Sequence, residues 1–175
     1  MNAYAVAKFI ASVDEVDSRK RLQKALFFVQ EAGCKLDAEY ELYLYGPYSR
    51  DLAIVTDQLE AAKIIEKQEE NNGCGGVRYR YIISDTKRLE EFEATEAGKK
   101  EKAELEKFVP LFKRLNTVHL WELELASTVA YYHRRVELDW DEAKKRTAAF
   151  KKEAIDSPRM MAAEKLAHEV FQDAA

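Results

Sequence analysis

Two strand-like runs joined by a glycine-rich segment constrain the fold of this 175-residue chain more than any other feature. Residues 63–68 (KIIEKQ) and 77–84 (VRYRYIIS) have strand composition, whereas residues 71–76 (NNGCGG) can form only a turn. Two strands joined by such a turn form a β-hairpin. Because side chains alternate along a strand, Arg78 and Arg80 share one face and Tyr79 lies on the other.

The residues before this hairpin predict helices with one short extended segment among them. Capping residues and apolar periodicity predict helices over 3–13, 18–33 and 49–62, and EYELYLY (39–45) predicts a strand that Gly46-Pro47 ends. Helix, strand and helix followed by a basic-edged hairpin is close to the order of a winged helix. The sequence therefore predicts a winged-helix-like half over residues 1–98.

Residues 99–175 are helix-rich, with charged residues between regularly spaced Leu, Ala and Phe. The expected helices cover 95–105, with a kink or break at Pro110, then 118–134, 141–152 and a last one that starts at Ser157-Pro158. The predicted fold class is α+β and mainly α. A winged-helix-like N-terminal half with a small β-hairpin or sheet packs on a helical C-terminal half, and the two form one compact unit.

Charge and composition exclude several classes of protein. With 28 Lys and Arg against 32 Asp and Glu, the net charge is −4, which argues against an indiscriminate nucleic-acid coater. No apolar run approaches the roughly 18 residues of a membrane span, and the N-terminus does not resemble a signal peptide. Two cysteines are too few for a disulfide framework. We therefore expect a cytoplasmic protein with no membrane association.

Residues with metal-binding or catalytic chemistry do not cluster in the sequence. Cys34 and Cys74 stand apart from each other and from any zinc motif. His119 and His133 lie about 21 Å apart along one predicted helix, so they cannot share a metal ion. The sequence predicts no catalytic residue, no metal and no small-molecule cofactor. An unrecognised enzyme site would need a pocket with converging polar groups near His119 or Glu122.

Basic residues mark a candidate nucleic-acid-binding surface. They come from the second helix, the third helix and the hairpin: Arg19, Arg21, Lys24, Arg50, Arg78 and Arg80. Such side chains can contact phosphate oxygens. However, the third helix would have to read the DNA, and it also carries Asp57 and Glu60, which repel the DNA backbone. We expect DNA binding only if Arg19, Lys24, Arg78 and Arg80 converge on one face.

Four tyrosines within nine residues mark a candidate protein interface. Tyrosine is enriched at interfaces because it joins a large apolar body to a polar tip. Some of these side chains must fill the core, but burying all four in a domain this size is difficult. We therefore predict an exposed groove that binds a protein partner or a second copy of the chain. The candidate partner-binding residues are Tyr43, Tyr45, Tyr48, Gln23 and Lys24.

Two short motifs carry a resemblance to a known family. Leu22-Gln23-Lys24, followed by an aromatic-rich helix and then Tyr45-Gly46-Pro47-Tyr48-Ser49, resembles the YwgA-like family of uncharacterised prokaryotic proteins. In outline it is also similar to the Panacea domain of SocA-like antitoxins. The C-terminal stretch 123–132 (LELASTVAYY) resembles the YwgA-like pattern as well. The first similarity implies no established activity, and the second implies an interaction module that neutralises toxins.

Three hypotheses about function follow from these observations. The first is a non-enzymatic, antitoxin-like interaction protein that binds a protein partner. The alternative is a winged-helix regulator that binds DNA, and the second alternative is an enzyme with an unrecognised site.

Overall fold

The computed structural model describes residues 1–71 and 77–172. The residues predicted to form most of the hairpin turn, 72–76, lie outside the described residues, and so does Cys74. The described helices are α1 (Ala3–Ala11), α2 (Arg19–Glu31), α3 (Arg50–Ala61), α4 (Thr86–Glu93), α5 (Glu96–Glu106), α6 (Val109–Thr117), α7 (Leu120–Arg134), α8 (Trp140–Lys151) and α9 (Pro158–Gln172). The described strands are β1 (Val16–Asp17), β2 (Glu41–Tyr43), β3 (Gly46–Tyr48), β4 (Ile65–Asn71) and β5 (Val77–Ile83). The fold is therefore mainly helical α+β, as predicted.

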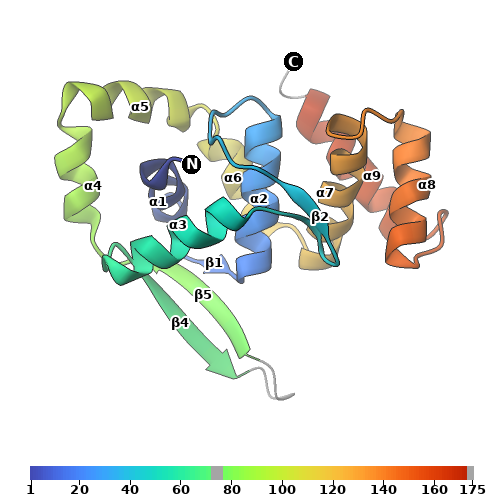
Figure 1. The fold of residues 1–175 in the computed structure, drawn as a ribbon, viewed down its shortest axis with the longest axis horizontal. Helices are drawn as coiled ribbons and strands as arrows, with labels where there is room; N and C mark the ends of the chain where they lie inside the picture. The colour runs from blue at the N-terminus through green and yellow to red at the C-terminus, as the bar shows by residue number, and fades with distance from the viewer. Residues whose placement is uncertain (72–76, 173–175) are drawn as a thin grey trace.

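The N-terminal half has the arrangement of a winged helix. β4 and β5 pair antiparallel from Ile65↔Ile83 to Asn71↔Val77, which confirms the predicted hairpin. β1 pairs with the other edge of β5, so the sheet has the order β1-β5-β4. Helices α1, α2 and α3 pack beside this sheet, and β4 and β5 project from the body of the molecule (Figure 1). α3 is the last helix before the hairpin, where a winged-helix regulator places the helix that reads DNA.

Local signals in the sequence account for the ends of α2 and α3. Ser18 caps α2 by accepting a hydrogen bond from the backbone N–H of Arg21, and Ser49 caps α3 through the N–H of Leu52. Gly33 follows α2 with a φ of 109°, a conformation that glycine adopts without steric cost. The first residues of both predicted ranges, 18 and 49, are therefore the N-caps of α2 and α3, and Gly33, the last residue of the range predicted for α2, follows the end of that helix.

The region around Gly46-Pro47 differs from the prediction. The strand expected over 39–45 is shorter, and Gly46–Tyr48 forms a second strand that pairs with it in the register Glu41↔Tyr48. Pro47 lacks a backbone N–H, which normally excludes it from a central strand. In this two-stranded sheet each strand is an edge, so the missing donor costs no interior ladder bond. The result is a hairpin that turns at Leu44 and Tyr45.

The C-terminal half is helical, and two described helices lie outside the expected ranges: α4, at the end of the N-terminal half, and α6. α4 has only eight residues, TKRLEEFE, and buries only Leu89, so its pattern is too short to identify a helix from the sequence. The break expected near Pro110 is present, since α5 ends at Glu106 and α6 takes Pro110 into its first turn. Among the described residues, no helix has both the length and the apolar composition that crossing a bilayer requires.

A single hydrophobic cluster includes residues of both halves. On α2, the side chains of Phe27 and Phe28 are fully buried, and on α7 those of Leu123 and Val129 are. α7 packs against α2, α8 and α9, which places it at the centre of the C-terminal half (Figure 1). The contact between α2 and α7 positions the hairpin of β2 and β3, because β3 packs on both helices.

Candidate functional site: a tyrosine-lined groove

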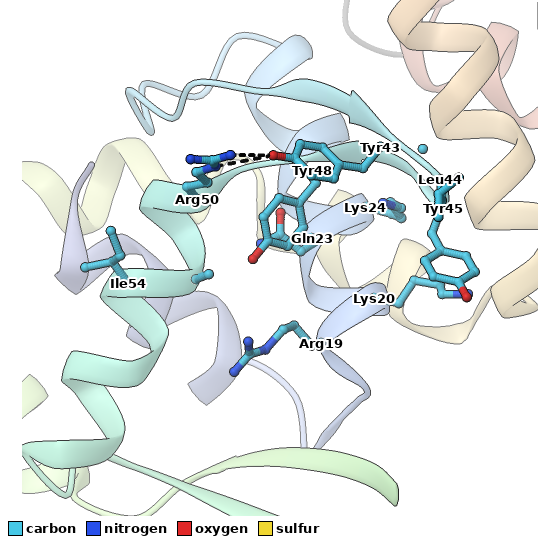
Figure 2. A pocket seen from close by; sticks show the side chains of 12 residues that line it. Arg19, Lys20, Gln23, Lys24, Tyr43, Leu44, Tyr45, Tyr48, Arg50 and Ile54 are labelled. Carbon is cyan, nitrogen blue, oxygen red and sulfur yellow. Dashed lines mark hydrogen bonds between the residues drawn. The ribbon is translucent and has the colours of Figure 1, made fainter. Parts of the chain in front are cut away.

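An open groove lies between α2, α3 and the hairpin of β2 and β3. Its volume is about 720 Å³. Figure 2 shows its side chains projecting from these three elements. The lining residues are Arg19, Lys20, Gln23, Lys24, Tyr43, Leu44, Tyr45, Gly46, Tyr48, Arg50, Ala53 and Ile54. All five residues predicted to bind a partner line this one groove.

Two glutamines of α2 hold the ends of the segment that forms the groove wall. Gln23 is buried, and its side-chain amide donates to the carbonyl of Ser49 at 2.9 Å and accepts from the N–H of Ser49 at 2.8 Å. Gln30, two turns further along α2, makes the same pair of bonds with Ala38, both at 2.9 Å. Segment 38–49 is therefore clamped to one helix at both ends, which fixes the position of its hairpin.

The hairpin of β2 and β3 is also held by residues of α2, α7 and α8. Lys24 is buried, and its Nζ donates to the carbonyl of Pro47 at 2.6 Å. Lys151 of α8 donates to the carbonyl of Leu44 at 2.7 Å. Gly46 approaches α7 so closely that a Cβ there would lie 2.6 Å from Oγ1 of Thr128. The groove wall therefore depends on contacts with α2, α7 and α8.

The two motifs that carry the family resemblance are joined by these bonds. Gln23 and Lys24 of the Leu-Gln-Lys motif bind the backbone of Ser49 and Pro47, in and just after the Tyr-Gly-Pro-Tyr motif. Both side chains are thus anchors of the hairpin, and each also forms part of the groove lining.

The carboxylate of Glu124, beside the groove, forms ion pairs with two lysines. Glu124 of α7 accepts hydrogen bonds from Lys20 at 2.8 Å and from Lys151 at 2.7 Å. Burial favours the protonated form, yet these two bonds hold the pKa of Glu124 below its usual value. Lys24 has no such direct bond to a carboxylate among the described residues. Burial, together with repulsion by Lys151 and Lys20, lowers the pKa of Lys24 to about 7 despite the attraction of Glu124.

This low pKa makes the stability contributed by residue 24 depend on pH. Between pH 7 and 10.5 the unfolded chain binds a proton at Lys24 that the folded chain has lost, so stability rises with pH in this window. We expect wild type to gain about 2 kcal/mol relative to Lys24→Met between pH 7 and pH 9. Urea unfolding of both proteins at each pH measures the difference. An equal difference at the two pH values would contradict a Lys24 pKa near 7.

The predicted tyrosines divide between core and surface. Tyr40 is buried and packs edge-on against Phe27, as expected for part of this segment. Tyr43 and Tyr45 keep 39% and 60% of their surface exposed. The ring of Tyr48 lies 5.3 Å from that of Tyr43, centroid to centroid, so the two rings form one wall of the groove.

Of the six predicted nucleic-acid-binding residues, Arg19, Lys24 and Arg50 line the groove. Arg19 donates to the hydroxyl of Tyr81 at 3.2 Å and forms an ion pair with Asp57 at 3.0 Å. Arg50 donates to the hydroxyl of Tyr43 at 2.8 and 3.3 Å, the two bonds drawn in Figure 2.

The other three arginines lie elsewhere and are engaged. Arg21 is buried and donates to the carbonyl of Val118 at 2.6 Å. Arg78 pairs with Asp17, and Arg80 pairs with Glu70 at 2.8 Å. Lys24 is buried under β3, so Arg19, Lys24, Arg78 and Arg80 do not converge on one surface.

The region around His119 and Glu122 forms no part of the groove. His119 precedes α7 and its ring stacks on Trp121, with the planes 13° apart. None of the five cavities described along residues 1–71 and 77–172 has His119 or Glu122 in its lining. Within the same residues, no three His, Cys, Asp or Glu side chains are grouped so that they could hold a metal ion.

Several residues of the groove were not predicted from the sequence. Leu44 and Ile54 expose 80% and 55% of their surface, the first at the hairpin turn and the second on α3. An apolar residue at a turn and one on the polar side of an amphipathic helix are signals that sequence reasoning can use. Glu124 and Lys151 lie beside the groove and form ion pairs there. Nothing in the sequence indicated these pairs, because the paired residues are distant from one another along the chain.

Comparison with known proteins finds one distant likeness. The chain is similar to the uncharacterized protein YwgA of Bacillus subtilis. The two are 28% identical over 79 residues, which is 45% of this chain and 47% of the relative. The match therefore spans about half the length of that relative, whose name records no activity. No protein-family model matches the chain.

Proposed function

We propose that this chain is a non-enzymatic interaction protein that binds a segment of a partner protein in the tyrosine-lined groove. The observation that carries the proposal is the apolar character of an open groove of about 720 Å³. Its wall includes four large side chains that stay well exposed: Tyr43, Leu44, Tyr45 and Ile54. Exposed apolar side chains gathered in one place are typical of interaction sites.

The way the groove is held also supports binding. A wall that is fixed before the partner arrives loses little conformational entropy when it binds. Here the hairpin is tied to α2 by Gln23 and Lys24 and to α8 by Lys151. The exposed residues Leu44 and Tyr45 are therefore presented on a fixed turn. Lys20 supports Tyr45 further, since its Nζ lies 4.0 Å from the centre of that ring.

The winged-helix arrangement favours a second candidate, DNA binding, but the charges argue against it. Asp57 is exposed on α3 and Glu60 lies near the end of that helix. On β4, Glu66, Glu69 and Glu70 are exposed as well. Asp57, Glu60 and Glu70 pair with Arg19, Lys67 and Arg80, whereas Glu66 and Glu69 form no ion pair among the described residues. The two unpaired acids lie on the hairpin that would have to approach the phosphate backbone, which they would repel. We therefore rank DNA binding below protein binding.

The finer part of the proposal concerns the partner. The resemblance to the Panacea domain extends it to an antitoxin-like role, in which the groove holds a toxin. A second copy of the chain is the alternative occupant, and sedimentation of the purified protein separates the two. Replacing Tyr45 and Tyr48 by alanine would disrupt a dimer formed through the groove.

Site-specific cross-linking tests the proposal. A photo-reactive phenylalanine analogue at position 44 is expected to cross-link one defined protein in cells that express the chain. The same analogue at Met161, which is 57% exposed on α9, is the control because it lies outside the groove. For the protein so identified, we expect Tyr45→Ala to weaken binding at least about tenfold, as at other aromatic hot spots. Met161→Ala should leave the affinity unchanged.

Two outcomes would contradict groove binding. One is that positions 44 and 161 capture the same proteins to the same extent. The other is that Tyr45→Ala and Met161→Ala bind the captured protein equally well while both remain folded by circular dichroism.

A further inference from the structure

The charges that line the groove have one sign, although the chain as a whole is acidic. Acidic residues outnumber basic ones by 32 to 28 in the sequence. The groove lining nevertheless includes Arg19, Lys20, Lys24 and Arg50 and no acidic side chain. The groove is therefore an apolar surface with a basic rim, and its chemistry is complementary to an apolar group that carries negative charge.

Three of these four cations already have partners. Arg19 pairs with Asp57, Lys20 pairs with Glu124, and the Nζ of Lys24 is bound to a backbone carbonyl. Their charge is neutralised nearby or buried, so they contribute little to the binding of a new anion.

Arg50 is different. Among the residues that the structure describes, it forms no ion pair, and its bonded partner is the neutral hydroxyl of Tyr43. A guanidinium has five N–H donors, so Arg50 keeps donors for a second group. Because its side chain is at the groove and exposed to solvent, it can receive a carboxylate with two parallel hydrogen bonds.

The apolar side chains lie next to this arginine. Ile54 is four residues after Arg50 on α3, so the two are neighbours on one helix face. Tyr43 links Arg50 to the hairpin, where Leu44 and Tyr45 continue the apolar surface (Figure 2). A ligand that places a carboxylate on Arg50 therefore lays the neighbouring part of its chain over Ile54 and the tyrosines.

We infer that the partner segment is a peptide with large apolar side chains and an aspartate or glutamate close to them, and that Arg50 receives its carboxylate. This inference rests on the proposed function and names the class of partner. A polyanion such as duplex DNA fits less well, because its charge extends past Arg50 and the other three cations of the groove are already paired or buried. A peptide carries its carboxylate at one point.

Selection from a displayed random-peptide library tests the inference. The folded wild-type protein is the bait, and Tyr45→Ala is the bait that reports whether the peptides use the groove. We expect the enriched peptides to combine Leu, Ile, Phe, Trp or Tyr with a nearby Asp or Glu. Arg50→Glu should weaken their binding at least about tenfold. The matched control is Arg159→Glu on α9, which changes the net charge equally outside the groove.

The outcomes separate the two proposals. Enriched peptides that are basic or uncharged, and that lose binding in Tyr45→Ala, would overturn the partner class and leave groove binding intact. Peptides that bind wild type, Tyr45→Ala and Arg50→Glu equally well would overturn both, and so would the absence of any enriched peptide. If random-sequence duplex DNA binds wild type directly, displaces the peptides from it and does not bind Arg50→Glu, the groove would be assigned to nucleic acid and the inference overturned.

Discussion

Gln23→Leu is expected to destabilise the fold by about 3 kcal/mol. The side chain of Gln23 is 2% exposed, and its amide is bonded to both the N–H and the carbonyl of Ser49, whose own side chain is fully buried. Leucine has a similar size but leaves the N–H of Ser49 without a partner in a site that excludes water, whereas the carbonyl keeps its hydrogen bond from the N–H of Ala53 at 3.3 Å. An unpaired buried group costs about 1–3 kcal/mol, and losing the bond to the carbonyl costs about 0.5–1.5 kcal/mol more. Domains of this kind are stable by only about 5–15 kcal/mol, so the loss is a large fraction of the total.

Urea unfolding measures this loss as a lower midpoint with an unchanged slope. Gln30→Leu is the matched control, because Gln30 makes the same pair of bonds from the same helix at a half-buried position. Water can replace the amide there, so we expect a cost of about 1 kcal/mol. Equal midpoints for the two variants would show that burial of the Gln23–Ser49 bonds is not what makes them important.

The winged-helix half could be predicted because its signals are local. Serine caps, a glycine after α2 and two strands around a glycine-rich segment are all contained within a few residues of the chain. The second strand of the tyrosine hairpin could not be predicted in this way. In a sequence, Pro47 indicates the end of a strand, because proline is tolerated only in a strand at the edge of a sheet. β3 is such a strand, since it pairs with β2 alone, and its position depends on its packing against α2 and α7.

The candidate site was predicted in part for the same reason. Tyrosines grouped within nine residues predicted the groove wall, whereas the basic start of α2 was predicted as part of a nucleic-acid-binding surface, with Lys24 assigned to both. The sequence did not show that Gln23 and Lys24 serve as anchors, because their partners are backbone groups more than twenty residues away. Nor did it distinguish Arg50 from the other arginines, since that distinction depends on which of them have an acidic partner in the folded chain.

Gly46→Ala is expected to cost about 3 kcal/mol, for two separable reasons. Gly46 has a φ of 88°, where an L-residue is strained by about 1–2 kcal/mol. In addition, the new Cβ would lie 2.6 Å from Oγ1 of Thr128, which itself donates to the carbonyl of Glu124 at 2.8 Å. Thr128 is buried and cannot move aside without losing that bond, and such overpacking costs about 1–3 kcal/mol. The urea midpoint of Gly46→Ala should fall accordingly.

A double-mutant cycle with Thr128→Ala separates the two contributions. Removing Oγ1 removes the clash but leaves the backbone strain, so in the Thr128→Ala background we expect Gly46→Ala to cost only about 1–2 kcal/mol. The same cost in both backgrounds would show that contact with α7 does not restrict residue 46. If the clash matters, Gly46→Ala must also push the hairpin away from α7. We then expect Gly46→Ala to weaken partner binding at the groove, and Thr128→Ala to restore it even though Thr128 does not line the groove.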